Sequence, residues 1–446
     1  MNHTSSLTVT VGLLLVGLAG LGGTSAPAHL RAGAGGQGSP GARRLLLLEN
    51  LTLIDGTGTA PVQGARIVIE GERIRAAGHV EAPRDAERID LGGAAVLPGI
   101  VDAHLHIEKD PKLVLRQLSF GVTSFRDPGQ WIEAFEPLKK LITEEQLPGP
   151  RYSMCGPHID GENPAYPRDS YVARDAEEAR RQAERAIAGG ATAIKIYYRL
   201  PLESALAVID VCKRRGVAST AHLEILDARD LLRAGLNGLE HITSFGVSLM
   251  PPREGEKYRQ AVLKDNAARN EGRYRVFASL DLDGPEARDL LEVVRKTRPF
   301  VDATLAVFEV RPPPGDKRFP PEVQQIAVKG FAEMKRLTAL LHRNGAKIVL
   351  GGHTSVRFAG RGEAPLRELE LLVESGLTPM EAIQAATLVG AQFLFRDKEI
   401  GSLEKGKLAD LIVVQGDPLQ DISAMRRVDR VMIGGRWIDT AKYRNY

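Results

Sequence analysis

The sequence predicts an α/β fold: a (β/α)8 TIM-like barrel together with a small β-sandwich formed by both ends of the chain. Apolar, strand-like segments alternate with amphipathic helical segments through the middle of the chain, which is typical of a parallel sheet. Eight such strands can be counted, and their total length suits a closed barrel. Short alternating segments separated by turns come before and after this region and indicate a separate β domain.

The predicted barrel occupies residues 97–395. Helical segments at 175–190 and 201–216 end at glycine, as helices often do. Residues 246–299 follow the sixth strand and predict an enlarged helical loop, which in barrels usually builds or covers a binding site. The eight strands are expected at 96–106, 121–127, 151–156, 191–198, 216–224, 238–244, 300–309 and 346–355.

The β-sandwich is expected from residues 45–96 together with residues 396–446. In the first segment, GARIVIEGERIRAAG alternates apolar and polar residues around a Gly-Glu turn, as a hairpin does. The second segment follows a helix expected at 378–394, and GSLEKGKLADLIVV within it predicts strand, turn and strand. Both segments have the same character, which is why one domain is expected from the two chain ends.

Residues 1–28 resemble an export signal. The apolar stretch LTVTVGLLLVGLAGLGG is followed by SAPA, a small-residue cleavage site that ends at Ala28. No Lys or Arg precedes the stretch and glycine interrupts it, so an uncleaved membrane anchor is the alternative. Residues 29–44 are rich in glycine and predict a flexible linker. We therefore expect an exported protein, periplasmic or secreted, with no membrane association beyond export.

Composition excludes several other classes. The net charge is +3 and no block of like charges stands out, so nucleic acid is not expected as a partner. The two cysteines, Cys155 and Cys212, form no disulfide framework and are expected to be buried thiols. The expected partner is a small molecule, and a homo-oligomer is left open.

Four histidines are placed where strands of the predicted barrel end. His104 and His106 follow the apolar run AVLPGIVD, and residues two apart on a strand face the same way. His222 ends VASTAH and His241 ends GLEH. Active sites of barrels collect at the carboxyl ends of the strands, and neutral imidazoles there bind divalent metals. Because scattered core histidines would not converge in this way, the four predict a metal site.

Lys195 is unusual because it lies inside the apolar strand ATAIKIYY. A buried ammonium is costly unless it is paired. One interpretation is an ion pair with an acid from a neighbouring strand. The other is that the amine is neutral and carboxylated, which makes an anion with two oxygens that can bridge two metals.

The chain resembles the amidohydrolase superfamily over about residues 45–440. The resemblance is carried by the segment LPGIVDAHLH and by Lys195, His222 and His241. It is also carried by the helix LTPMEAIQAATLVGAQFL and by the strand-turn-strand segment GSLEKGKLADLIVV. The imidazolonepropionase-like and bacterial prolidase-like branch is the most similar, on the segments GVTSFRD and AIKIYY.

This resemblance implies a barrel plus a small β-sandwich, with one or two divalent metal ions. Zinc is the implied metal, with manganese or cobalt as alternatives. His104 and His106 would hold the more buried ion, His222 and His241 the outer one, and carboxylated Lys195 would bridge them. A metal-activated hydroxide would then attack a carbonyl, which gives a hydrolase of the C–N bond in an amide, a dipeptide or a cyclic amide.

The chain departs from the family pattern at the eighth strand. Members normally place an aspartate there, in a G-T-D-like turn, whereas this chain has His353 in VLGGHTSV. A neutral His353 can bind a metal and accept a proton, so we expect it to act as the catalytic residue. The alternatives are a carboxylate from elsewhere, namely Glu108, Asp302 or Glu309, or weak or absent catalysis. In the last case the chain would be a non-catalytic exported ligand-binding protein on the same scaffold.

Three further residues near strand ends are expected to contact substrate. Tyr197 and Tyr198 follow Lys195 on its strand, and His158 lies in the loop after the third strand. Arg126 and its neighbour Asp127 are expected to form a structural ion pair.

Overall fold

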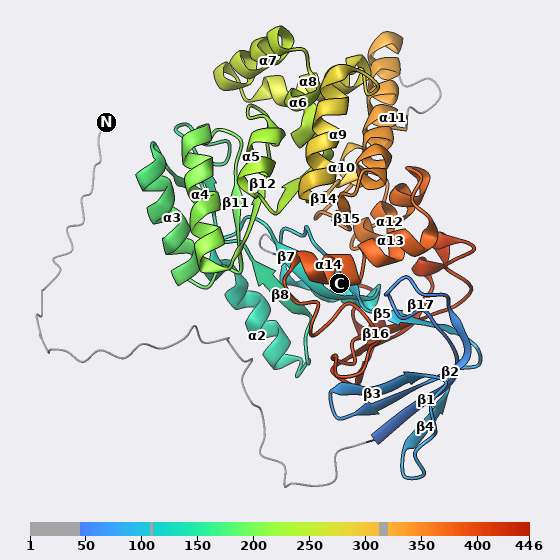
Figure 1. Ribbon diagram of the computed structural model, residues 1–446. Coiled ribbons are helices and arrows are strands. Elements are labelled where there is room, and N and C mark those ends of the chain that lie inside the picture. The colour runs from blue at the N-terminus through green and yellow to red at the C-terminus, as the bar shows by residue number, and fades with distance from the viewer. Residues whose placement is uncertain (1–44, 108–109, 312–319) are drawn as a thin grey trace, which may run out of the picture. The chain divides into compact units, whose positions relative to one another are not determined.

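A computed structural model gives the fold of most of the chain (Figure 1). It describes residues 45–107, 110–311 and 320–446. The predicted leader at 1–28, the predicted linker at 29–44 and the alternative carboxylate Glu108 therefore lie outside the described residues.

One sheet draws its eight strands from both ends of the chain. Its order is β18-β17-β16-β5-β1-β2-β3, with β4 paired to β1. The antiparallel pairing of β5 with β16 joins the two parts, so segments far apart in the sequence lie side by side (Figure 1). The strands are β1 Leu45–Leu53, β2 Val62–Glu70, β3 Arg73–Gly78, β4 Glu87–Asp90, β5 Ala95–Pro98, β16 Leu411–Val414, β17 Val428–Ile433 and β18 Arg436–Ile438.

Two parallel sheets make up the central part of the chain. One has the order β6-β7-β8 and the other β10-β9-β11-β12-β13-β14-β15. The amide of Ala103 donates to Leu350 O over 2.8 Å, and the amide of Thr192 donates to Met154 O over 2.7 Å, so hydrogen bonds connect the two sheets. The strands are β6 Ile100–Asp102, β7 Val122–Asp127, β8 Arg151–Met154, β9 His158–Asp160, β10 Ser170–Val172, β11 Ala193–Ile196, β12 Ala218–Ala221, β13 Gly238–Glu240, β14 Phe300–Asp302 and β15 Lys347–Val349.

Each of the eight predicted strands contains an observed strand, and most of these are shorter than expected. The polar residues at the carboxyl ends of the predicted strands lie in the loops that follow the observed strands. Strands β9 and β10 were not predicted, because each has only three residues and no alternating pattern.

Helices lie between and outside the parallel strands (Figure 1). No helix in the described part of the chain is both long and apolar enough to cross a lipid bilayer. The α-helices are α1 Pro111–Ser119, α2 Glu136–Glu144, α3 Ala176–Ala188, α4 Leu202–Arg215, α5 Ala228–Ala234, α6 Gly246–Leu249, α7 Pro252–Lys264, α8 Ala267–Ser279, α9 Pro285–Thr297, α10 Leu305–Phe308, α11 Pro321–Arg343, α12 Ala364–Glu374, α13 Pro379–Ala385 and α14 Leu388–Phe393. Short 3-10 helices are η1 Ile132–Phe135, η2 Ile242–Phe245, η3 Ile422–Arg426 and η4 Thr440–Lys442.

The prediction of one helix over 378–394 was wrong, because the segment contains two helices, α13 and α14. The carbonyl of Ala385 accepts from the amide of Leu350, and the carbonyl of Ala386 accepts from the amide of Val101. These two carbonyls are therefore used by β6 and by the end of β15 instead of by the next helical turn. The helix ends so that its backbone can hold two strands.

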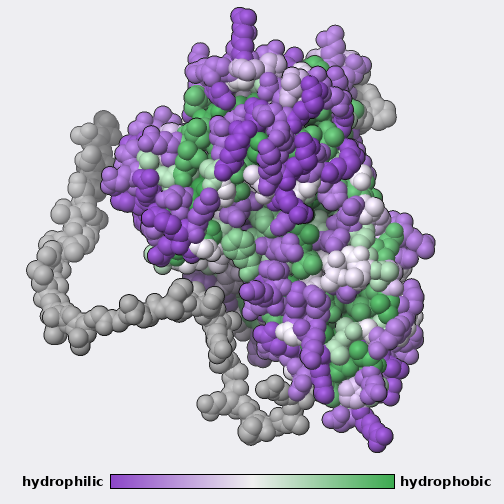
Figure 2. All heavy atoms as spheres, viewed as in Figure 1, coloured by the Kyte–Doolittle hydropathy of each residue, from purple (hydrophilic) through white to green (hydrophobic). Residues whose placement is uncertain are grey.

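The enlarged loop predicted at 246–299 contains the helices α6 to α9. Its outer surface, at the top of the view in Figure 2, is mostly hydrophilic. On α7, only Gly255 and Val262 are buried. The insertion contacts the loop that follows β12, because Arg259 of α7 donates to Ile225 O over 2.7 Å.

The start of α10 depends on one buried carboxylate. Glu368 of α12 accepts hydrogen bonds from the amides of Leu305 and Ala306, at 2.8 and 2.7 Å. Burial raises the pKa of Glu368 to about 8, although the hydrogen bonds from the two amides favour its charged form and act in the opposite direction. The turn that Glu368 holds includes Thr304, which contacts the candidate site described below.

The substitution Glu368→Ala is expected to destabilise the protein by about 2–4 kcal/mol, because it leaves two buried amides without an acceptor. Denaturant unfolding of the purified protein measures this. The matched control is Glu374→Ala on the same helix, whose carboxylate is partly exposed and pairs with Lys335. Equal effects of the two substitutions would contradict a special role for Glu368.

Candidate metal centre

Five histidines meet at the carboxyl ends of the parallel strands. His104 and His106 follow β6, His222 follows β12, His241 follows β13 and His353 comes after β15. Ring centroids are 5.1 Å apart for His104 and His106, 4.7 Å for His104 and His241, and 4.5 Å for His222 and His241. The ring of His353 stacks on His104 at 5.2 Å. The structure therefore brings together all five histidines for which the sequence predicts a role in metal binding or catalysis.

Strained backbone positions two of these side chains. His241 and His353 both have a φ of 64°, in the left-handed region that non-glycine residues rarely occupy. The amide of His353 donates to His104 O over 2.6 Å, and the amide of His241 donates to Asp302 O over 2.7 Å. Such positions cost about 1–3 kcal/mol and persist only where the surroundings fix them. The strain supports a functional role for both rings.

Acceptors behind three of the rings fix which nitrogen faces the centre. The Nδ1 atom of His104 lies 2.6 Å from Asp302 Oδ2, and that of His241 lies 2.7 Å from Thr304 Oγ1. The Nδ1 atom of His106 is 3.5 Å from Asp127 Oδ1. This leaves the Nε2 atoms free to bind a ligand, and those of His104 and His106 face each other at 3.3 Å. Metal-binding histidines are typically held by such acceptors.

Burial keeps most of these rings neutral. It lowers the pKa of His106, and it lowers those of His222, His241 and His353 well below the ordinary value, with neighbouring positive groups adding to the effect. His104 differs: burial opposes its protonation, but the Asp302 and Glu240 carboxylates outweigh this and raise its pKa. A neutral imidazole is the form that binds a metal.

The residues present fit a divalent metal. One ligand atom from each of His104, His106 and His353 lies within 4.8 Å of the others, and His104, Glu240 and Asp302 form a second such group. The buried atoms His222 Nδ1 and Asp302 Oδ1 have no hydrogen-bond partner in the described structure. Nitrogen and carboxylate ligands in this combination suit zinc and similar ions.

Lys195 lies within this group, next to a carboxylate that sequence reasoning missed. Its Nζ atom is 3.2 Å from Glu240 Oε2, which is itself 3.1 Å from His104 Nδ1. Glu240 also accepts from Arg126 over 2.9 Å. Burial would raise the pKa of Glu240, but the positive charges of Arg126 and Lys195 outweigh it and hold the pKa well below the ordinary value.

The predicted ion pair between Arg126 and Asp127 was therefore wrong. Neighbouring residues on a strand point to opposite faces, so Arg126 reaches Glu240 while Asp127 accepts from the amides of Ile107 and Gly129. An acid inside the buried strand GLEH, like the lysine inside ATAIKIYY, was the signal that Glu240 is part of this network.

The residues predicted to contact substrate lie beside the outer histidine. The ring of Tyr197 is 5.0 Å from that of His222 and 4.5 Å from that of His158. The ring of Tyr198 is 5.7 Å from that of His222. Both ring nitrogens of His158 and the hydroxyl of Tyr198 are buried without a hydrogen-bond partner among the described residues. These unpaired groups are suited to binding a polar ligand.

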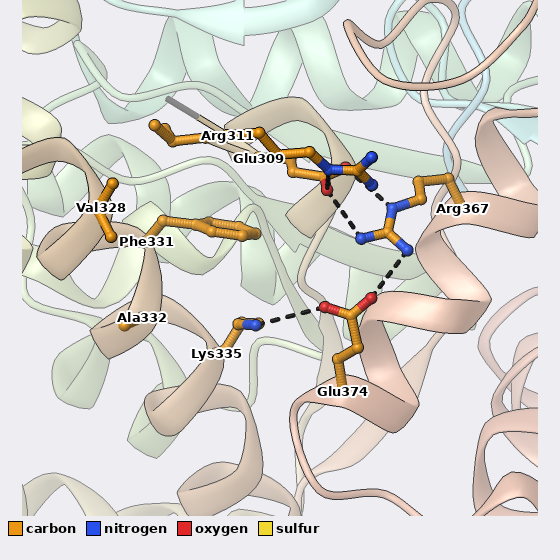
Figure 3. Close-up of a pocket in the computed structure, with 9 residues that line it drawn as sticks. Glu309, Arg311, Val328, Phe331, Ala332, Lys335, Arg367 and Glu374 are labelled. Carbon is orange, nitrogen blue, oxygen red and sulfur yellow. Dashed lines mark hydrogen bonds and ion pairs between the residues drawn. The ribbon is translucent and has the colours of Figure 1, made fainter. Parts of the chain in front are cut away.

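The alternative carboxylates differ in position. Asp302 lies at the centre, in contact with His104. Glu309 does not: both its oxygens bind Arg367, and it also pairs with Arg311, in the wall of a cavity of about 410 Å³ that none of the five histidines lines (Figure 3). Lys335 and Glu374 pair on another wall of that cavity (Figure 3), whose lining has three cationic side chains and two carboxylates.

Comparison with known proteins finds similarity to amidohydrolases. The model of the Amidohydrolase family matches residues 332–438. The fold resembles the crystal structure of a Xaa-Pro dipeptidase with a TM-score of 0.68, over 88% of this chain and 99% of that one, at 22% identity. Residues 332–438 are thus similar to the Amidohydrolase family. The fold also resembles that of a putative prolidase from Bifidobacterium longum, with a TM-score of 0.67 and 24% identity over 90% of this chain and 95% of that one.

Curated relatives of this protein match shorter stretches. Imidazolonepropionase of Streptomyces avermitilis is 45% identical over 47 residues, which are 10% of this chain and 11% of that enzyme. The chain matches between 11% and 19% of the length of the curated relatives found. The sequence matches therefore support the superfamily, and the solved structures show the fold.

Loss of the Glu240 charge is expected to destabilise the protein strongly. Glu240→Gln leaves Arg126 and Lys195 without their buried counter-charge, which costs about 3–5 kcal/mol. Denaturant unfolding measures the loss. The control is Glu49→Gln, which breaks an ion pair with the exposed Arg88 and should change stability little. If Glu240→Gln were as stable as the wild type, the pairs of Glu240 with Arg126 and Lys195 would not be needed for folding.

Proposed function

We propose that this protein is a metal-dependent amidohydrolase that cleaves the C–N bond of a small amide, a dipeptide or a cyclic amide. The observation that carries the proposal is the set of converging histidines, three of which have Nδ1 held by an acceptor and Nε2 free. Similarity to the Amidohydrolase family over residues 332–438, and over short stretches to a D-aminoacylase and an imidazolonepropionase, supports hydrolysis at a C–N bond.

We further propose that the two parallel sheets form one (β/α)8-type barrel, and that the sheet of both chain ends belongs to a β-sandwich. The hydrogen bonds Ala103 N to Leu350 O and Thr192 N to Met154 O support the barrel, because they connect the sheets on two sides. The separate apolar core of the chain-end sheet supports the second domain.

In this proposal His104, His106 and His353 hold one metal, and His222 and His241 hold another. A divalent metal lowers the pKa of bound water toward 7 and polarises a carbonyl. The protein's own residues orient the ligands: Asp302, Asp127 and Thr304 each hold a ring through Nδ1. His353 stands where the family has an acid, and burial holds its pKa well below the ordinary value. The neutral ring has one acceptor nitrogen, so it would either bind a metal or accept a proton at any one time.

Carboxylation of Lys195 remains part of the proposal, with the ion pair to Glu240 as its alternative. A carbamate on Nζ would place an anion beside Glu240, and only Arg126 would then balance the two charges. A bound metal would supply the missing positive charge. An ammonium needs no metal, because it already forms the pair with Glu240 at 3.2 Å. The number of metals is thus tied to the state of Lys195.

A non-catalytic, ligand-binding role is the second candidate. The observation that favours it is His353, because a neutral imidazole supplies no negative charge at the position of the family's aspartate. This function would leave the chain able to bind small molecules without turnover.

We expect purified protein to contain metal and to release product from a panel of N-acyl amino acids, Xaa-Pro dipeptides and cyclic amides. His104→Ala and His241→Ala should each remove metal and reduce turnover by at least about 100-fold, because each removes a ligand. Elemental analysis and product release are the measurements. His342→Ala is the control, since His342 pairs with Glu381 away from the centre. A metal-loaded protein without turnover on the panel would favour the non-catalytic role.

The state of Lys195 is tested by growth or exchange in ¹³C-bicarbonate. We expect a protein-bound carbamate carbon in the NMR spectrum, together with about two metals per chain, and expect both to be lost in Lys195→Ala. Lys195→Arg keeps the positive charge next to Glu240 and is the control for folding. Two metals per chain without a carbamate signal would contradict the link between carboxylation and the second metal.

A further inference from the structure

Arg269 is a buried cation that the metal centre does not use. It lies on α8, in the insertion that follows β13, and only 7% of its surface is exposed. Its Nε atom has no hydrogen-bond partner, and no carboxylate forms an ion pair with it among the side chains that the structure describes, which leave out Glu271 of the same helix. A buried guanidinium without a counter-charge is costly.

The other buried arginines show how this fold usually neutralises such a charge. Arg126 pairs with Glu240 at 2.9 Å, and Arg367 pairs with Glu309 at 2.8 Å. Among the described residues, only these three arginines are buried, and Arg269 alone has no carboxylate. The difference shows that Arg269 lacks a partner that the protein supplies elsewhere.

Aromatic rings connect Arg269 to the histidines. Its guanidinium lies 5.0 Å from the centroid of the Tyr198 ring, and an Nη atom is 3.5 Å from the hydroxyl of Tyr166. The Tyr198 ring contacts His222, and the Tyr166 ring contacts Tyr197 at 5.6 Å. Arg269 is therefore separated from the outer histidine by about one side chain.

The nearest acid is already engaged. Glu224 lies 3.2 Å from His222 through Oε1 and accepts from the hydroxyl of Tyr258 through Oε2 over 2.7 Å. It makes no ion pair with Arg269. The guanidinium of Arg269 instead lies next to the ring of Tyr198. The hydroxyl of Tyr198 and both ring nitrogens of His158 are also buried without a hydrogen-bond partner among the described residues.

Resting on the proposed function, we propose that Arg269 binds a carboxylate of the substrate. Arginine recognises carboxylates through two parallel hydrogen bonds, and burial strengthens them. A substrate whose C–N bond lies at the histidines and whose carboxylate lies one side chain away is an N-acyl amino acid or a dipeptide. A neutral cyclic amide would leave Arg269 unpaired. The insertion after β13 thus selects acidic amides over neutral ones.

The test compares acids with their neutral carboxamides. N-acetylleucine is paired with N-acetylleucinamide, in both enantiomers, and alanylproline with alanylprolinamide; acetate or alanine release is measured with the metal-loaded protein. The wild type should prefer the acid in kcat/KM by on the order of 100-fold. Arg269→Met should lose most of this preference, with the carboxamide changed less than about threefold. Arg269→Lys should restore part of the preference, because a lysine keeps the charge but not the bidentate geometry.

Arg275→Met is the matched control, since Arg275 lies exposed on the same helix. Equal use of acid and carboxamide by the wild type would overturn the proposal without any variant. If Arg269→Met lowers kcat/KM equally for the acid and the carboxamide of a pair, the proposal is also overturned, and Arg269 has a structural role. If the wild type turns over no pair, calorimetry decides about Arg269: tighter binding of N-acetylleucine than of its amide supports it, and equal affinity overturns it.

Discussion

The buried carboxylate of Glu240 is the constraint on which the centre of this structure depends. The side chains of Arg126 and Lys195 reach the interior from β7 and β11, and Glu240 contacts both of them as well as His104. Its neighbour in the chain is His241, so the same strand end neutralises the interior and supplies a ring to the centre. The charge beside the candidate metal site is therefore balanced by one side chain. This arrangement explains how a lysine can lie inside an apolar strand.

The position of the histidines could be predicted because it follows from strand geometry alone. Polar residues at the ends of parallel strands meet at one edge of the sheets, whatever the loops do. The partner of Arg126 could not be predicted in the same way. Glu240 lies 114 residues further along the chain, and their contact depends on how far each side chain crosses the interior. The helix predicted over 378–394 failed for a related reason: two of its carbonyls are required by strands distant in the sequence.

The insertion between β13 and β14 shows where sequence reasoning ends. Its existence and its helical character were predicted from residues 246–299. The contacts of Tyr258 with Glu224 and of Arg269 with Tyr198 depend on the path of the loop, which no periodicity encodes. The centre is thus built from residues at the ends of the parallel strands, whereas Tyr258 and Arg269 beside it come from the insertion.

The left-handed backbone at His353 has an evolutionary consequence. A φ of 64° is tolerated best, apart from glycine, by asparagine, aspartate and histidine. The acid typical of the superfamily can therefore occupy this turn without moving the chain, and the codons of histidine and aspartate differ by a single base. The local geometry accepts either residue, so a lineage can exchange a charged turn for a neutral one in a single mutational step and keep its scaffold intact.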